Sequence, residues 1–435
     1  MADSLASQIA HLYRRAGFGA TPAQAAAAAA ATGGYRAAVE SLLDRSARDA
    51  ADGVATPSPI ATNRDGQVET LDQRRARQQL RQRQRTDITM WWLERMVISD
   101  QPLREKLAFF WHAHFATSID KVNEAALMLQ QNITLRTLGA GSFEALAQAV
   151  AIDPAMLVWL DANQNKKGSP NENFARELME LFTIGIGNYT DADVREAARA
   201  FTGWRIDRQS GTFVNQPKNF DGGVKTVLGQ TGPFTGEQVV TLLVKTPASA
   251  RFVVSKLWSR FAYPVLPEDP IVSQLAPGFA ADGDITNVLR AMFNHPDFVS
   301  TRARQGLVKQ PTEYLVGALR ALSLRPSGLN GGPNLLAALR TLNQVPFEPP
   351  SVGGWGQNGY WVSTATELAR LKLATALVNR ATLDWLTGAG DRPAAIARQL
   401  GVDAWTAATT SALNKASAPR NQLIVALVSP EYVLN

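Results

Sequence analysis

Residues 169–185 read SPNENFARELMELFTIG and place three carboxylates, one arginine and two asparagines on about three turns of one predicted helix. Ser169 precedes Pro170, and Glu172 falls at the third helical position, so this order predicts an N-cap with a capping box. A surface helix does not need so many specific polar groups to stay dissolved. The stretch therefore predicts either a buried polar network that fixes the fold or one wall of a functional site.

Four polar side chains of this stretch share one face of the predicted helix. Asn173, Arg176, Glu177 and Glu180 lie three or four residues apart, and residues at that spacing are neighbours on a helix surface. Paired carboxylates serve acid–base or metal chemistry, and an arginine holds a carboxylate or phosphate with two parallel hydrogen bonds. A buried network of glutamate, arginine and asparagine between helices is the structural alternative.

A second stretch, residues 102–117 (PLREKLAFFWHAHFAT), predicts a helix that is apolar on all sides. One face carries Leu103, Leu107, Phe110 and His114, and the opposite face carries Ala108, Phe109, His112 and Phe115. A helix of this kind lies in the centre of a large domain, so we expect both histidines to be buried. Because they are two residues apart on a helix, they point to opposite sides and could chelate one ion together only if the backbone is not helical there. Each could separately meet Glu177 or Glu180 from the neighbouring helix.

The composition is that of a globular protein: 45% of the 435 residues are apolar and 19% are charged. Recurrent caps predict an all-α fold in one large multi-helical domain, residues 1–435, built around helices at 102–117, 170–184 and 191–202. Thr190 with Asp193 predicts the cap of the third helix. A minor β-hairpin is expected near 211–228, and residues 46–71 are expected to form a polar loop or flap.

The charge pattern and the N-terminal residues limit which partners and which cellular location the sequence predicts. The chain carries 44 basic and 38 acidic side chains, a modest excess, and residues 74–85 (RRARQQLRQRQR) contain six arginines. We interpret that run as a solvated helix face or as a patch for an anionic surface; no aromatics interleave with it, which disfavours nucleic acid. The sequence shows neither a signal peptide nor a membrane span, and it leaves the localisation open.

Absent residues and motifs narrow the chemistry. The chain has no cysteine, which excludes disulfides, thiolate nucleophiles and cysteine metal sites. It has no phosphate-cradling GxxxxGK[ST], no GxSxG, no HExxH and no dinucleotide fingerprint.

Six residues are the candidates for catalysis. A histidine that is hydrogen-bonded to a carboxylate is oriented for proton transfer or for metal binding. We therefore expect a pocket that combines the members of two helices and one loop: His112, His114, Arg176, Glu177, Glu180 and Lys309. The candidate ligands of a divalent metal are His112, His114, Glu177 and Glu180. Satisfied core histidines and a structural ion network are the competing interpretation.

Further residues are candidates for ligand binding. Lys309 stands just before the helix that Gln310 and Pro311 open, where it is placed to bind an anion. Glu313 is expected to pair with Arg176 or with Lys309, and a helix start with a surface ion pair is the structural alternative. Aromatic side chains on glycine loops stack on sugars or plug the core. The predicted substrate-binding set is Asn173, Trp204, Glu313, Trp355 and Trp361.

Six segments, taken in order, resemble a known bacterial family, domain of unknown function 1800. They are HLYRRAGFG (11–19), FWHAHFATS (110–118), the stretch from NENFAREL to AFTGW (171–204), FDGGVKTVLGQTG (220–232), KQPTEYL (309–315) and VGGWGQNGYWVSTATELAR (352–370). Phe220 stands where some relatives are expected to carry histidine, so any role of that histidine is missing here.

The resemblance implies a largely helical bacterial protein. Relatives are often exported, and their genes often lie beside those of a second family, numbered 1501, which resembles sulfatase-like hydrolases. This implies a cell-envelope setting and a protein partner of that family, but no established reaction.

Two functions follow from these observations. The first is an enzyme that uses the His/Glu/Arg/Lys cluster for acid–base or metal-assisted hydrolysis of a cell-envelope glycan or a related polymer, with lysine and arginine stabilising negative charge. The second is a non-catalytic interaction or scaffold protein that acts with a partner of the family numbered 1501. The density of the polar cluster favours the first.

Overall fold

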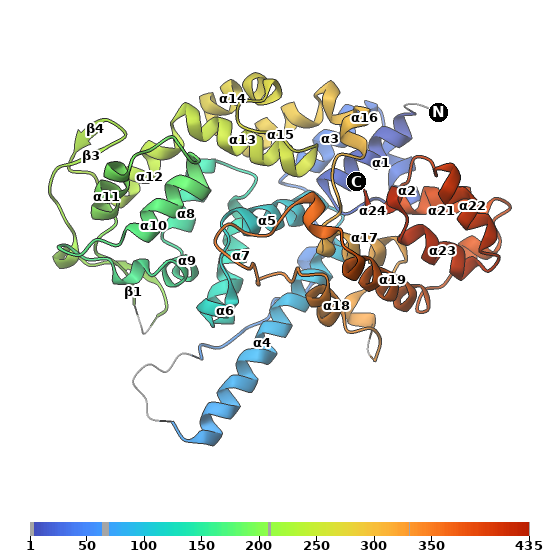
Figure 1. Cartoon of the computed structure of the whole chain (residues 1–435), viewed down its shortest axis with the longest axis horizontal. Coiled ribbons are helices and arrows are strands. Elements are labelled where there is room, and N and C mark those ends of the chain that lie inside the picture. The colour runs from blue at the N-terminus through green and yellow to red at the C-terminus, as the bar shows by residue number, and fades with distance from the viewer. Residues whose placement is uncertain (1–3, 63–68, 208–209, 330, 435) are drawn as a thin grey trace.

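The computed structural model describes residues 4–62, 69–207, 210–329 and 331–434, and it confirms a predominantly α-helical fold (Figure 1). The helices of the first half are α1 (Leu5–Ala16), α2 (Pro22–Ala30), α3 (Gly34–Leu43), α4 (Leu71–Ile98), α5 (Pro102–His114), α6 (Ile119–Val122), α7 (Ala125–Leu138), α8 (Phe143–Ala151), α9 (Pro154–Trp159), α10 (Glu172–Glu177), α11 (Asp191–Ala200) and α12 (Gly236–Val244).

The second half continues with helices of similar length. They are α13 (Pro247–Phe261), α14 (Pro270–Asp282), α15 (Ile285–Phe293), α16 (Thr301–Arg304), α17 (Pro311–Ala321), α18 (Leu335–Thr341), α19 (Thr364–Val378), α20 (Asp384–Thr387), α21 (Arg392–Leu400), α22 (Ala407–Lys415), α23 (Pro419–Leu427) and α24 (Pro430–Val433). Within the described residues, no helix is both long enough and apolar enough to cross a membrane.

The β structure consists of two short antiparallel hairpins in the described part of the chain. Strand β1 (Trp204–Ile206) pairs with β2 (Phe213–Asn215), and β3 (Lys225–Val227) pairs with β4 (Gln230–Gly232). They lie at one end of the molecule beside α11.

Helix α5 is the seam between two hydrophobic clusters. Leu103 and Leu107 belong to the cluster formed with α1, α3, α8 and α10–α15, whereas Ala108 and Phe109 belong to the cluster formed with α4 and α17–α24. The central position that the all-round apolar pattern predicted is therefore confirmed. Phe115 differs from the prediction: it lies with the first cluster because the helix ends at His114, and its φ of −92° and ψ of 55° turn it off the helical face.

The polar helix starts later than the sequence predicted, so the predicted capping box of Ser169 and Glu172 is wrong. The N-cap is Asn171, whose side chain accepts a hydrogen bond from the Asn173 amide. Ser169 lies instead in a tight turn, where its amide donates to the Lys166 carbonyl at 3.0 Å.

Beyond α10 the helix widens into a π-helical segment, Leu178–Thr183. After the turn at 184–190, α11 begins at the predicted Thr190–Asp193 capping box, which is confirmed. Helices α10 and α11 pack together as a helical hairpin.

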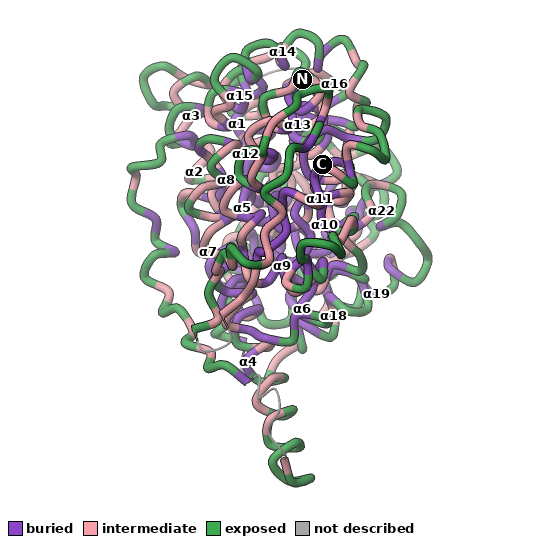
Figure 2. Tube along the Cα trace, turned by 90° about the vertical axis from the view of Figure 1, so that its left-hand side faces the viewer, coloured by how far each residue is buried: buried purple, intermediate pink, exposed green. Residues whose placement is uncertain are grey.

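Helix α4 projects from the body of the molecule, and its first half is largely exposed (Figures 1 and 2). The arginine run lies on this half. Four of its arginines pair with carboxylates: Arg75 with Asp72, Arg77 with Glu69, Arg81 with Glu124, and Arg85 with Asp120 and Glu348. The predicted loop at 46–71 contains a short 3₁₀ turn, Ala50–Gly53, and otherwise irregular backbone; its residues 63–68 lie outside the described part of the chain.

The glycine-rich segment 346–363 packs its backbone against the end of α5. Gly354 has φ +77°, and a Cβ atom there would lie 2.3 Å from the Ala113 carbonyl oxygen. Both the left-handed backbone and this close approach require glycine.

We predict that Gly354→Ala lowers the free energy of unfolding by about 2–4 kcal/mol, because the new methyl group collides with backbone in a strained conformation. Urea denaturation checks this. Gly359→Ala is the matched control, since a Cβ there meets nothing within 4 Å. Equal stability of the two variants would contradict the packing described for this segment.

Candidate functional site

The polar groups of α10 find local partners. Arg176 forms ion pairs with Asp191 at 3.0 Å and with Glu172 at 3.5 Å. The hydroxyl of Tyr189 donates to Glu180. These contacts join α10 to the turn and helix that follow it.

The side chains of Glu177 and Asn173 make fewer polar contacts than that of Arg176 does. Glu177 is half-buried and has no hydrogen bond or ion pair within the described residues; burial, and then the charge of Glu180, raise its pKa. Asn173 is exposed, and its amide group donates to the Leu160 carbonyl at 3.3 Å.

The two histidines of α5 lie on opposite sides of the helix, as the spacing predicted. Nε2 of His112 accepts a hydrogen bond from the Phe347 amide at 3.0 Å, and Nε2 of His114 lies 2.9 Å from the Phe182 carbonyl. Burial lowers the pKa of each imidazole to about 3. Both are neutral at pH 7, and no described hydrogen bond or ion pair joins either of them to Glu177, Glu180 or Lys309.

The three tryptophans of the predicted substrate-binding set are buried. Trp204 packs against Phe174 and Phe201, and Trp355 packs against Phe109 and His112. Trp361 is fully buried beside the exposed Tyr360. In the described part of the chain, no group of three or more histidine, aspartate or glutamate side chains is arranged as metal ligands would be.

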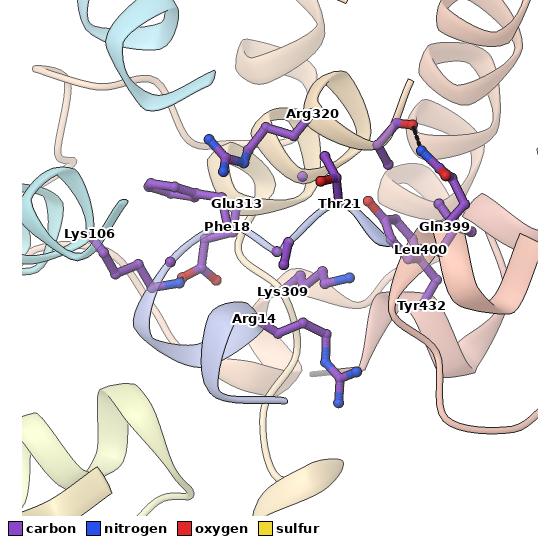
Figure 3. Close-up of a pocket in the computed structure, with 15 residues that line it drawn as sticks. Arg14, Phe18, Thr21, Lys106, Lys309, Glu313, Arg320, Gln399, Leu400 and Tyr432 are labelled. Atoms are coloured by element: carbon purple, nitrogen blue, oxygen red, sulfur yellow. Dashed lines mark hydrogen bonds and ion pairs between the residues drawn. The ribbon is translucent and has the colours of Figure 1, made fainter. Parts of the chain in front are cut away.

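Lys309 and Glu313 lie elsewhere, at a small pocket that we name the Lys309 pocket (Figure 3). Segments distant in sequence form its wall: the end of α1 with the loop 17–21, and parts of α5, α17, α21 and α24. The charged and aromatic side chains of the lining include Arg14, Phe18, Lys106, Lys309, Glu313 and Tyr432.

Glu313 is the charged centre of this region. Its carboxylate accepts a hydrogen bond from the Lys106 ammonium, pairs with Arg260 at 2.8 Å and accepts the Gln310 amide at 3.0 Å. Burial opposes ionisation, but Arg260 and Lys106 hold the pKa of Glu313 down to about 2. The predicted partner Lys309 also contributes positive charge, while the direct contacts belong to Lys106 and Arg260.

Cations outnumber carboxylates around the pocket. Among the described residues, five basic side chains that are buried or nearly so surround the buried Glu313: Arg14, Arg15, Lys106, Arg260 and Lys309. A second carboxylate, Asp403, lies at the edge, 3.8 Å from Arg14 and 2.9 Å from Arg304.

Several buried donors of this region have no described acceptor. They include Nε and Nη1 of Arg15, Nε of Arg260 and the hydroxyl of Tyr432. Desolvation, followed by the nearby Arg14, lowers the pKa of Arg15 to about 9. Buried donors normally have partners, so these groups point to a missing acceptor.

Lys309 is the most exceptional of the cations. Its residue is 7% exposed, and its ammonium lies 3.4 Å from the centroid of the Tyr432 ring. The ammonium has no hydrogen bond or ion pair to any described residue. Burial, and then the charge of Arg14, lower its pKa well below the usual value. In Figure 3 its amine extends between Arg14 and Tyr432, whereas the Arg14 guanidinium turns away toward Gly401.

Glycines allow close packing in the wall of the pocket. A Cβ atom at Gly17 would lie 2.9 Å from Pro102, and one at Gly317 would lie 3.2 Å from the Phe18 carbonyl oxygen. The backbone of Lys309 is fixed by its own amide, which donates to the Val433 carbonyl at 2.9 Å.

The sequence singled out only part of this site. Lys309 as an anion ligand and Glu313 as an ion-pair partner were predicted, but Arg14, Arg15, Lys106 and Tyr432 were not. A usable signal was present, because two of the six segments that carry the family resemblance, 11–19 and 309–315, supply opposite walls of the pocket.

Fold and site together define a helical protein with a buried, cation-rich pocket. The model of the family described as "Protein of unknown function (DUF1800)" matches residues 11–434, and the chain belongs to that family. Comparison with curated proteins and with solved structures finds no match.

We predict that Glu313→Gln lowers the free energy of unfolding at pH 7 by about 3–5 kcal/mol, because it leaves buried cations without their counter-charge. Because the folded pKa of about 2 lies below the value of 4.5 for a free glutamate side chain, the carboxylate stabilises the native state above pH 4.5. In the wild type this contribution is lost as the pH falls from 4.5 toward 2. Urea denaturation across this range measures both effects.

Glu237→Gln, at an exposed position, is the control and is expected to change stability by less than about 0.5 kcal/mol. A loss for Glu313→Gln no larger than that of the control would show that the central ion pairs contribute little.

Proposed function

We propose that the protein binds a small anion, or the anionic group of a larger ligand, in the Lys309 pocket. The observation that carries the proposal is Lys309: its residue is 7% exposed, and its amine borders a cavity and lacks any described acceptor. A buried ammonium without a counter-charge is costly, and an incoming anion relieves that cost.

The excess of cations supports the same proposal. Glu313 already shares its charge between Lys106 and Arg260, and Asp403 pairs with Arg14, so neither carboxylate neutralises Arg15 or Lys309 as well. The buried and unpartnered Arg15 nitrogens add hydrogen-bond donors within electrostatic reach of Lys309. Positive groups in a water-poor site act on an anion far more strongly than they do in water.

The size of the pocket limits the ligand. The volume open to the centre of a water molecule is about 20 Å³, which exceeds what one water needs. A cavity of this size holds about one water molecule, so it would admit a carboxylate group or one or two oxygens of a phosphate or sulfate, with the rest of the ligand outside the mouth. The loop 17–21 forms one rim, and it carries glycine at 17 and at 19.

This proposal changes the emphasis of the sequence-based hypotheses. Hydrolysis of an envelope glycan by His112, His114, Arg176, Glu177, Glu180 and Lys309, with or without a metal, stays a prediction. The separate placement of these side chains gives it less support than anion binding receives. The bacterial cell-envelope setting and a partner of the family numbered 1501 likewise stay predictions from the resemblance.

We expect phosphate or sulfate to raise the stability of the wild type in proportion to occupancy. The gain is about 2.7 kcal/mol when the free ligand is one hundred times its dissociation constant. Lys309→Met is expected to abolish this gain, because it removes the amine and keeps most of the side-chain volume. Thermal denaturation at constant ionic strength, with isothermal titration calorimetry, measures the effect.

Lys218→Met, on the exposed surface, is the matched control and should retain the ligand-induced gain. The comparison uses the change on adding ligand, so a different intrinsic stability of Lys309→Met does not affect it. An equal gain in the wild type and in Lys309→Met would refute binding at this pocket.

A further inference from the structure

We propose that Lys309 is a carbamylation site: its amine adds reversibly to carbon dioxide, and the resulting carbamate places its carboxylate among the cations of the Lys309 pocket. The inference rests on the proposed function in one respect, namely that the pocket accepts negative charge. It goes further by naming the ligand and by making the attachment covalent.

The position of the amine is the first argument. Lys106 and Lys309 are both buried, but Lys106 donates to Glu313 and is held by it. Lys309 has no such acceptor and extends along the cavity against the Tyr432 ring. Of these two lysines, therefore, only Lys309 is free to react.

The second argument is the protonation state. Only an unprotonated amine adds to carbon dioxide, and a lysine in water is almost wholly protonated at neutral pH. Burial among Arg14, Lys106 and Arg15 disfavours the ammonium form of Lys309, whereas Glu313 is the carboxylate that opposes this effect. The pocket thus supplies the reactive form of the amine.

The third argument is the stability of the product. Carbamylation replaces the neutral amine by an anion in a region with surplus positive charge. The Tyr432 hydroxyl lines the pocket, is buried without a described acceptor, and would donate to the carbamate. Arg15 lies outside the lining but adds positive charge that Glu313, already held by Lys106 and Arg260, does not neutralise.

The reaction balances without a cofactor. The lone pair of Nζ forms a bond to the carbon of carbon dioxide while one C=O π pair moves to oxygen. The nitrogen then releases one proton to water, so that Lys–NH₂ and CO₂ give Lys–NH–COO⁻ and H⁺. A cavity of about 20 Å³ open to water centres admits so small a reactant.

The test is ¹³C NMR of the full-length protein equilibrated with ¹³C-bicarbonate. Trapping with a trialkyloxonium salt and peptide mass spectrometry then locate the label. We expect one carbamate signal per chain in the wild type, with the trapped mass on the peptide that contains Lys309. Lys218→Met should keep the signal and Lys309→Met should lose it, while circular dichroism verifies that both variants are folded.

Each outcome separates this inference from the proposed function. Absence of the carbamate signal in folded wild type, or its persistence in Lys309→Met, overturns carbamylation. If phosphate still stabilises the wild type but not Lys309→Met, anion binding is supported and only carbamylation is overturned. If both occur, bicarbonate should weaken phosphate binding, because both ligands fill one pocket. If neither occurs, both proposals fail.

Discussion

The buried carboxylate of Glu313 is the contact on which the centre of this protein depends. It belongs to α17, and its partners Lys106 and Arg260 belong to α5 and α13. α13 packs in one hydrophobic cluster, α17 packs in the other, and α5 serves both. Because a buried charge without a partner is strongly destabilising, these ion pairs specify how the three helices meet.

The same arrangement explains why a pocket persists beside the core. One carboxylate satisfies Lys106 and Arg260, but the neighbouring Arg14, Arg15 and Lys309 are close enough to add their charges. Packing apolar side chains against these groups would remove them from water without a counter-charge. A small polar cavity avoids that cost. Under the proposed anion binding, the surplus cations would also hold the ligand.

Local patterns predicted much of the fold but only a part of the site. The apolar residues on all sides of the predicted helix 102–117 correctly placed α5 in the centre of the protein. Thr190 with Asp193 correctly predicted the N-terminal cap of α11. The cluster at 169–185 was prominent because its charges are adjacent in sequence. The structure gives those charges local partners such as Asp191 and Tyr189.

The charged residues of the Lys309 pocket, in contrast, are far apart in the sequence. Lys106 and Glu313 are 207 residues apart, and each wall contributes one or two charged residues that look ordinary by themselves. Their convergence depends on long-range packing, which periodicity and capping do not encode. Only the resemblance marked both 11–19 and 309–315, without indicating that they meet.

Anomalous diffraction from crystals grown with bromide and kept free of bicarbonate tests the central claim most directly. The account predicts a bromide peak in the pocket, in contact with the Lys309 amine. Ordered bromide ions elsewhere on the molecule, with none in this pocket, would contradict it.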